Sequence, residues 1–295
     1  MAAIGVLLGL LVLATAAVVA FDRALAGSPV GGAVAAPARE VARGLVGQRR
    51  TTTAADSLLW RLGVGLVPVA ALLAALVLPL GGAAVADPAI GVVWFNAMEI
   101  LSWAAVWLAG WGPNSVFALV GGYRFVAQGL GYELPHMFAL ICAATGAGTL
   151  RVGGIVEAQQ DLWFVVWMPV AFAVYLLSAA AMAFWGPLGT ALGPDLAGGA
   201  AVEVSGVDRL LLLGGRWLLL VVAASMAVPL FLGGGAGPVL PGWAWTLLKT
   251  ALVLAAVVWL GRRVPVLRVE RFVPWAWIVL IPLVLLQLLV VAVGV

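Results

Sequence analysis

Residues 116–148 read VFALVGGYRFVAQGLGYELPHMFALICAATGAG, a mainly apolar stretch in which only Arg124 and Glu133 carry a formal charge. A transmembrane helix needs about 20 predominantly apolar residues, and this stretch is longer than that. Its length and composition therefore predict a membrane-spanning helix with charged side chains inside it. Gly129, Gly131 and Pro135 interrupt the run, so we expect the helix to be tilted or kinked there.

The rest of the chain has the same character. Of its 295 residues, 65% are hydrophobic and 9% are charged, with a mean hydropathy of +1.18, whereas soluble domains carry roughly 25% charged residues. These values exclude a soluble enzyme, a disordered chain and a disulfide scaffold. We expect an all-α polytopic membrane protein that forms a single transmembrane domain over residues 1–295. About eight transmembrane helices are predicted, at residues 2–21, 58–80, 90–111, 116–148, 161–184, 208–232, 242–260 and 272–294.

The basic residues predict the orientation. Arginines concentrate in residues 22–57 and 261–271, and the connections on the opposite side contain only Arg151. By the positive-inside rule, these two segments and the loop at 185–207 are cytoplasmic, which places both termini on the extracytoplasmic side. Residues 34–46 have near-helical apolar spacing, which fits a short amphipathic helix at the cytoplasmic interface and an ordinary loop equally well.

Several classes of site are disfavoured by composition. The single cysteine, Cys142, and the single histidine, His136, exclude an internal disulfide and a thiolate or histidine cluster for a metal. No nucleophile–base pair or phosphate-binding loop occurs, so we expect no catalytic residue, no metal and no covalently bound cofactor in this chain. Cys142 is expected to be a buried small hydrophobe. His136 is expected to have a packing role, with membership of a proton path beside Glu133 as the alternative. The net charge of +3 is spread along the chain, which favours contacts with membrane lipid or an acidic partner over nucleic acid.

Charged groups inside the predicted spans are the functional candidates, because a charge in hydrocarbon costs at least about 2.5 kcal/mol. Arg124 and Gln128 lie four residues apart and share a helix face, whereas Glu133 points nearly opposite and needs a partner from water or another helix. Burial disfavours a charged carboxylate, so Glu133 is predicted to exchange protons, with a structural ion pair as the alternative. The same two interpretations apply to the other charges in the spans, Glu99, Arg209, Arg216 and Lys249.

Short motifs occur in a fixed order along residues 58–295. They are AGW at 109–111, NS at 114–115, GGYR at 121–124, AQ at 127–128 and YE at 132–133; GG at 198–199 and VEVSG at 202–206; LGG at 232–234, GP at 237–238, LP at 240–241 and WTLLKT at 245–250; and RRVP at 262–265, Arg268, Glu270 and WAWIVLIP at 275–282. In this order and spacing, with the eight-helix topology, they resemble the H subunit of respiratory complex I, called subunit 1 in mitochondria.

The resemblance implies a membrane subunit of a proton-translocating NADH:quinone oxidoreductase in a prokaryotic inner (cytoplasmic) membrane. Such a subunit binds no redox centre, belongs to a translocase and is not catalytic alone. It anchors the peripheral redox arm, forms the quinone chamber and begins the polar axis that couples quinone reduction to proton pumping. Quinone is the substrate of the complex, and the implied partners are antiporter-like and small membrane subunits and a peripheral iron–sulfur arm.

The resemblance also implies roles for individual residues. The proposed proton path or polar axis contains Glu133, Arg124, Gln128, Glu203 and Lys249, together with Glu99 and Arg216. The proposed quinone chamber and peripheral-arm interface contains Asp195, Arg209, Arg268 and Glu270.

Three segments depart from the family pattern. The acidic-Arg-Arg motif and the Gly-Pro-Asn loop after the first helix are shortened here to FDR at 21–23 and GSPVG at 27–31. The acid-rich loop after the fifth helix keeps only Asp195, and Arg216 stands where the family has a glutamate. Glu99 lies outside the family pattern. We hypothesise that it takes over part of the role of an acidic residue that the family has and this chain lacks. These departures leave open an anchor subunit of a membrane-bound hydrogenase or formate-hydrogenlyase complex and, more remotely, an independent secondary transporter.

Overall fold

The computed structural model describes residues 2–79 and 84–294, and within these ranges the chain forms helices and no strands. Among the residues that the structure describes, six helical stretches are long and apolar enough to cross a membrane. They are α1 (Ala2–Leu25), α4 (Ser57–Ala75), α5 (Gly91–Trp111), α10 (Gly206–Phe231), α11 (Gly242–Arg263) and the continuous stretch of α12 (Val269–Trp275), a π-helical turn η5 (Ala276–Leu280) and α13 (Ile281–Gly294). The prediction of an all-α polytopic membrane protein is confirmed.

Two further helices correspond to the remaining predicted spans. Helix α6 (Val116–Ala147) contains 32 residues and continues as α-helix through Gly129, Gly131 and Pro135. Helix α9 (Pro169–Met182) is apolar but contains only 14 residues. Short helices α7 (Val152–Glu157) and α8 (Phe164–Trp167) connect α6 to α9.

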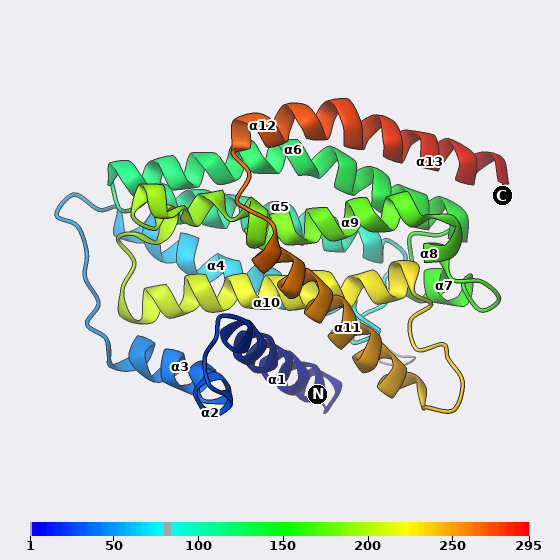
Figure 1. Ribbon diagram of the computed structural model, residues 1–295, viewed down its shortest axis with the longest axis horizontal. Coiled ribbons are helices and arrows are strands. Elements are labelled where there is room, and N and C mark those ends of the chain that lie inside the picture. The colour runs from blue at the N-terminus through cyan, green and yellow to red at the C-terminus, as the bar shows by residue number, and fades with distance from the viewer. Residues whose placement is uncertain (1, 80–83, 295) are drawn as a thin grey trace.

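The amphipathic segment predicted after the first span is helical. It forms α3 (Ala36–Val46), which follows the short helix α2 (Val30–Val34). Figure 1 shows α3 outside the bundle, below the first turns of α10, and a Cβ atom at Gly44 would meet the side chain of Leu210. Of the two interpretations of residues 34–46, the helical one is therefore correct.

Close packing of small residues holds the central helices together. Gly63 of α4 lies against the backbone of Ala109 of α5, and a Cβ atom at Gly63 would overlap that backbone. Small residues of this kind let membrane helices approach closely and gain van der Waals contact. Helix α6 lies beside α5, α9 and α13 (Figure 1), so its inward-facing side chains meet residues from α5 and α9.

The connection between α9 and α10 folds onto the first half of α6. It consists of four 3-10 turns, η1 (Gly186–Leu188), η2 (Thr190–Leu192), η3 (Pro194–Leu196) and η4 (Gly199–Ala201). Gly121 of α6 faces the backbone of Gly199 and Ala200, where any side chain would collide. This close approach brings the loop next to the polar residues of α6.

Candidate functional site

Two pairs of polar residues face each other across the α5–α6 contact. Asn96 and Glu99 lie three residues apart on α5, and Glu133 and His136 lie three residues apart on α6. Residues at this spacing share one helix face, so each helix presents two polar groups to the other. We call these four residues the central cluster.

The members of the central cluster contact one another directly. The Asn96 amide Nδ2 donates a hydrogen bond to Glu133 Oε1 at 3.1 Å. The His136 ring Nε2 lies 2.9 Å from Glu99 Oε2, and both side chains are fully buried. Glu133 also lies close enough to Glu99 and His136 for electrostatic interaction. The cluster therefore joins two carboxyl groups and one imidazole near the middle of α6.

Several polar atoms of the central cluster lack a hydrogen-bond partner among the described residues. They are both carboxylate oxygens of Glu99, both ring nitrogens of His136, Glu133 Oε2 and Asn96 Oδ1. The His136–Glu99 contact has the distance of an ion pair, but its geometry does not satisfy the criteria for a hydrogen bond. An unsatisfied buried polar group costs about 1–3 kcal/mol. Groups held inside a membrane bundle against such a cost are candidates for function.

Aromatic side chains enclose the cluster. The His136 ring lies 5.2 Å from the Tyr175 ring and 6.3 Å from the Phe95 ring, measured between centroids. The Tyr175 hydroxyl donates to the carbonyl oxygen of Ala223 at 2.8 Å, and the Tyr132 hydroxyl accepts a hydrogen bond from the indole N–H of Trp103 at 2.8 Å. These rings give the cluster an apolar wall in which electrostatic interactions are strong.

The folded loop between α9 and α10 reaches two of the predicted residues of α6. Gln128 is fully buried and donates to the carbonyl oxygen of Ala181 at 2.8 Å, while its side-chain oxygen accepts from the Thr190 hydroxyl at 3.1 Å. One turn earlier, Arg124 forms an ion pair with Asp195 at 2.8 Å. A residue predicted for the proton path thus contacts one predicted for the quinone chamber.

Arg216 of α10 is held by backbone and by rings. Its guanidinium donates to the carbonyl oxygens of Ala183 at 3.2 Å and Phe184 at 2.9 Å. It also lies 5.0 Å from the centroid of the Trp185 ring, a distance typical of a cation–π contact. Arg216 therefore fixes the start of the α9–α10 connection.

Lys249 of α11 lies in a cage of backbone carbonyls in the connection between α10 and α11. Its Nζ donates to the oxygens of Leu232 at 2.6 Å, Gly234 at 3.0 Å and Ala236 at 2.7 Å. The ammonium also lies 3.9 Å from the centroid of the Trp163 ring. An ammonium group has three donors, and each has an acceptor here. We call this arrangement the lysine clamp.

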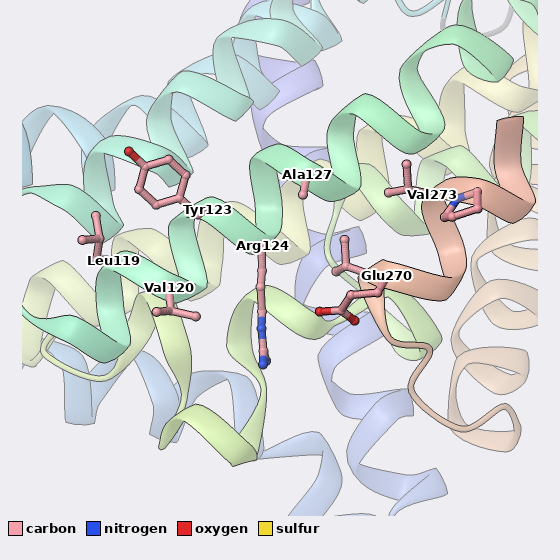
Figure 2. A pocket seen from close by; sticks show the side chains of 9 residues that line it. Leu119, Val120, Tyr123, Arg124, Ala127, Glu270 and Val273 are labelled. Atoms are coloured by element: carbon pink, nitrogen blue, oxygen red, sulfur yellow. The ribbon is translucent and has the colours of Figure 1, made fainter.

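The other predicted residues lie near the surface, in three places. Glu203 accepts a hydrogen bond from the Ser115 hydroxyl at 2.7 Å, and Arg209 donates to the carbonyl oxygen of Ala201 at 3.4 Å. Arg268 and Glu270 are exposed at the start of α12. Figure 2 shows Glu270 opposite Arg124 at a pocket of about 680 Å³ between α6 and α12, whose other lining residues are mainly apolar.

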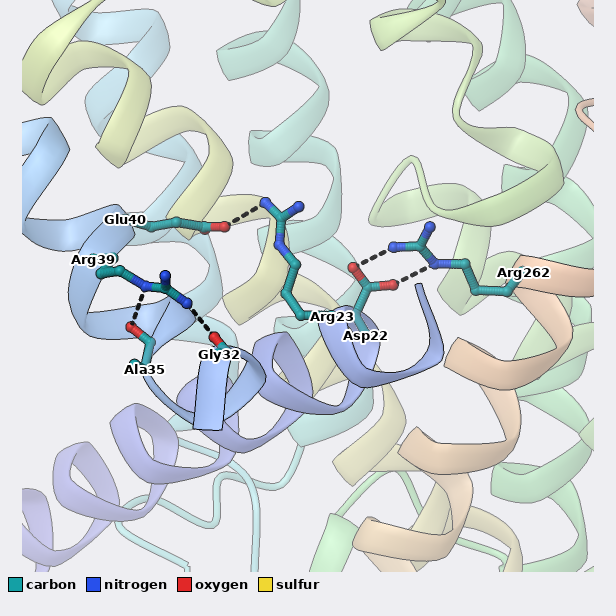
Figure 3. Close-up of polar contacts among 7 residues, drawn as sticks. All are labelled: Asp22, Arg23, Gly32, Ala35, Arg39, Glu40 and Arg262. Carbon is teal, nitrogen blue, oxygen red and sulfur yellow. Dashed lines mark hydrogen bonds and ion pairs between the residues drawn. The ribbon is translucent and has the colours of Figure 1, made fainter. Parts of the chain in front are cut away.

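An ion pair joins the shortened FDR motif to the basic segment before α12. Asp22 of α1 is buried and accepts two hydrogen bonds from Arg262 of α11, at 2.6 and 2.5 Å (Figure 3). The neighbouring Arg23 points to Glu40 of α3 at 2.5 Å. The motif therefore ties the first helix to α11 and to the amphipathic helix.

The sequence predicts Glu99 and Glu133 as functional charges, whereas for His136 it favours packing over membership of a proton path. The structure places the three together, whereas Lys249 lies in a separate site. The three-residue spacing of Glu133 and His136 is visible in the sequence and puts them on one face. The partner of that face is not visible, because it depends on how α5 and α6 are rotated against each other.

Comparison with known proteins gives consistent matches along the chain. A family model described as NADH dehydrogenase matches residues 2–292. The second of the NADH-quinone oxidoreductase H subunits of Geobacter sulfurreducens is 34% identical over 248 residues, which cover 80% of this chain and 75% of that protein. The corresponding second H subunit of Cereibacter sphaeroides is 37% identical over 210 residues, which cover 70% of this chain and 66% of that protein.

Proposed function

Because the chain belongs to the NADH dehydrogenase family, we propose that it couples quinone reduction to proton translocation in an oxidoreductase of the complex I type. In this proposal the chain anchors the peripheral redox arm, contributes the wall of the quinone chamber and begins the proton-coupling polar axis. It contains no redox centre of its own, and quinone is the substrate of the whole complex. Its partners are antiporter-like and small membrane subunits and a peripheral iron–sulfur arm.

The central cluster is the observation that carries the proposal. Glu133 is held by Asn96 near the middle of α6, with Glu99 and His136 beside it. Ionisable groups inside a membrane bundle are typical of proton relays. In our proposal Glu133 exchanges protons, and Gln128 and Arg124 extend the polar axis along the same helix toward the α9–α10 loop.

The exposed polar residues support the anchoring role. Arg268 and Glu270 are exposed at the start of α12, and Arg209 is exposed at the start of α10. Exposed charges of both signs suit an interface with another subunit, because complementary charges orient partners. We propose that this end of the bundle faces the cytoplasm and receives the peripheral arm, with both chain termini on the opposite side.

The test is purification and reconstitution of the complex through an affinity tag on this chain. We expect copurification of antiporter-like and iron–sulfur subunits, and acidification inside liposomes when NADH is oxidised by quinone. Glu133→Gln is expected to lower proton translocation at least about tenfold, while Cys142→Ala, a buried change on the same helix, leaves it unchanged. A wild-type complex that reduces quinone without moving protons contradicts the proposal.

The loop between α9 and α10 favours a second candidate, the anchor subunit of a membrane-bound hydrogenase or formate-hydrogenlyase complex. The four turns of this loop contain one acid, Asp195, and Arg124 already neutralises it. The rest of this connection adds one further acid, Glu203, and a loop with so few carboxylates fits a complex in which no quinone binds. If the chain copurifies with a nickel–iron hydrogenase module and not with an NADH-oxidising module, this second candidate is correct.

A further inference from the structure

We propose that Glu99 and His136 form a proton-holding pair that exchanges a proton with Glu133 in the interior of the bundle. The inference rests on the proposed function of proton coupling and extends it to His136. It also gives Glu99 a specific task, which is to connect the imidazole to the carboxyl group of Glu133.

The geometry permits direct proton exchange. The His136 Nε2 and Glu99 Oε2 atoms are 2.9 Å apart, and both side chains have no exposed surface. This separation lies within the range of hydrogen-bonded heavy atoms, so proton transfer requires a change in the orientation of the two groups and not in their distance. None of the four terminal polar atoms of the pair has another hydrogen-bond partner in the described part of the chain. The pair is therefore not committed to holding any other element in place.

The groups that face His136 come from three helices. Glu99 and Phe95 lie on α5, Glu133 lies on α6, and Tyr175 lies on α9. The Tyr175 hydroxyl is already engaged as a donor to Ala223. Among these groups, His136 is the one that can carry positive charge. It is thus the counter-charge for whichever carboxyl group is ionised.

This composition lets a proton move without changing the net charge of the cluster. When Glu133 and Glu99 are both protonated and His136 is neutral, the cluster has no net charge. If a proton leaves the Glu99 carboxyl group and binds Nε2 of His136, the product is an ion pair, and the net charge is still zero. The vacated carboxylate of Glu99 then accepts the proton of Glu133. Burial penalises net charge strongly, so exchange at constant net charge is the favourable route, and no electron moves.

Asn96 is positioned to hold Glu133 in both states. Its amide Nδ2 donates to Glu133 Oε1 at 3.1 Å, which suits the ionised carboxylate. Its Oδ1 is buried without a partner among the described residues, and an amide oxygen can accept from a protonated carboxyl group. The same side chain therefore fits Glu133 before and after proton loss.

The experiment uses the complete complex reconstituted in liposomes. The variants are Glu99→Gln, His136→Gln, the double variant and Glu99→Asp, with Cys142→Ala as the control for a packing change on α6. Coupled turnover and internal acidification are measured together. The redox-induced infrared difference spectrum of protonated carboxyl groups is recorded for each variant.

We expect each Gln variant to lower coupled turnover at least about tenfold. The double variant is expected to be no slower than the worse single one, because residues that act as one unit are non-additive. Glu99→Asp retains a carboxyl group and is expected to retain most of the turnover. A carboxyl band is expected to disappear in Glu99→Gln and to shift in His136→Gln.

The outcomes separate this inference from the proposed function. If wild type and Cys142→Ala acidify the liposomes and both Gln variants do so at the same rate, only the proton-holding pair is overturned. Multiplicative losses in the double variant overturn the pair as a unit. If wild type does not acidify the liposomes at all, the proposed function itself fails.

Discussion

Lys249 and the Glu99–His136 pair are both buried among membrane helices. They differ in how many hydrogen bonds their terminal polar atoms make. The Lys249 ammonium donates to three carbonyl oxygens. The two residues of the pair approach each other at 2.9 Å, but none of their four terminal polar atoms has a hydrogen bond in the described residues. A fully satisfied charge fixes the backbone around it. A charge whose partners can change is suited to move a proton. Burial alone thus does not distinguish a structural charge from a functional one.

The largest effect is expected from Lys249→Met. It leaves one buried and two partly buried carbonyl oxygens without their donor, and an unsatisfied polar group costs about 1–3 kcal/mol when buried. We expect the free energy of unfolding to fall by at least about 3 kcal/mol, measured by thermal denaturation of the purified complex in detergent. Lys249→Arg keeps the charge but presents a planar guanidinium to acceptors arranged around an ammonium, so its stability should fall between those of wild type and Lys249→Met. If Lys249→Met is as stable as wild type, Lys249 does not fix the backbone around it, and the contrast with the Glu99–His136 pair is wrong.

A smaller loss is expected from Trp163→Leu. The ring lies 3.9 Å from the Lys249 Nζ atom, and a desolvated cation–π contact contributes about 2 kcal/mol. The three carbonyl acceptors remain, so the clamp is weakened but not lost. The same denaturation assay with Trp243→Leu, an exposed tryptophan at the start of α11, provides the control. Equal losses in both variants show that the contact with Lys249 is not the cause.

A still smaller change in stability is expected when Glu99 and His136 are both replaced by Leu. Exchanging a buried ion pair for apolar side chains of similar volume is often neutral or stabilising, and here it also removes unsatisfied polar atoms. We expect the free energy of unfolding to fall by less than about 1 kcal/mol or to rise, while coupled proton translocation is lost. A strong destabilisation would show that the pair, like the lysine clamp, stabilises the fold.

The smallest effect is expected at an ion pair outside the bundle. Arg23 and Glu40 are 2.5 Å apart, but their side chains are 50% and 35% exposed, and such pairs contribute about 0–1 kcal/mol. Glu40→Gln is expected to change thermal stability by no more than that amount, and less at high salt because of screening. A change as large as that in Lys249→Met indicates that α3 is held to α1 mainly by this pair.

The pattern of apolar runs was sufficient to predict most of the fold. Within the described residues, each of the eight predicted runs contains a helix, because a chain in lipid must satisfy its backbone hydrogen bonds within each span. Helix α6 continues through Pro135, because a membrane helix tolerates proline when neighbouring helices support it, and the tilt or kink expected there stays a prediction. The short length of α9 and the four turns packed against Gly121 were not predicted, because they depend on contacts between distant segments.

The sequence alone determined that Glu99, Glu133 and Lys249 are charges placed where lipid excludes them, since only composition and length are needed for that conclusion. The tertiary structure decided which groups each of these charges contacts. The rotation of α5 against α6 put Glu99 beside His136, and the path of the α10–α11 connection put three carbonyls around Lys249. The physical reason is that a charge in a low-dielectric interior is governed by groups within a few ångströms, and these come from other helices.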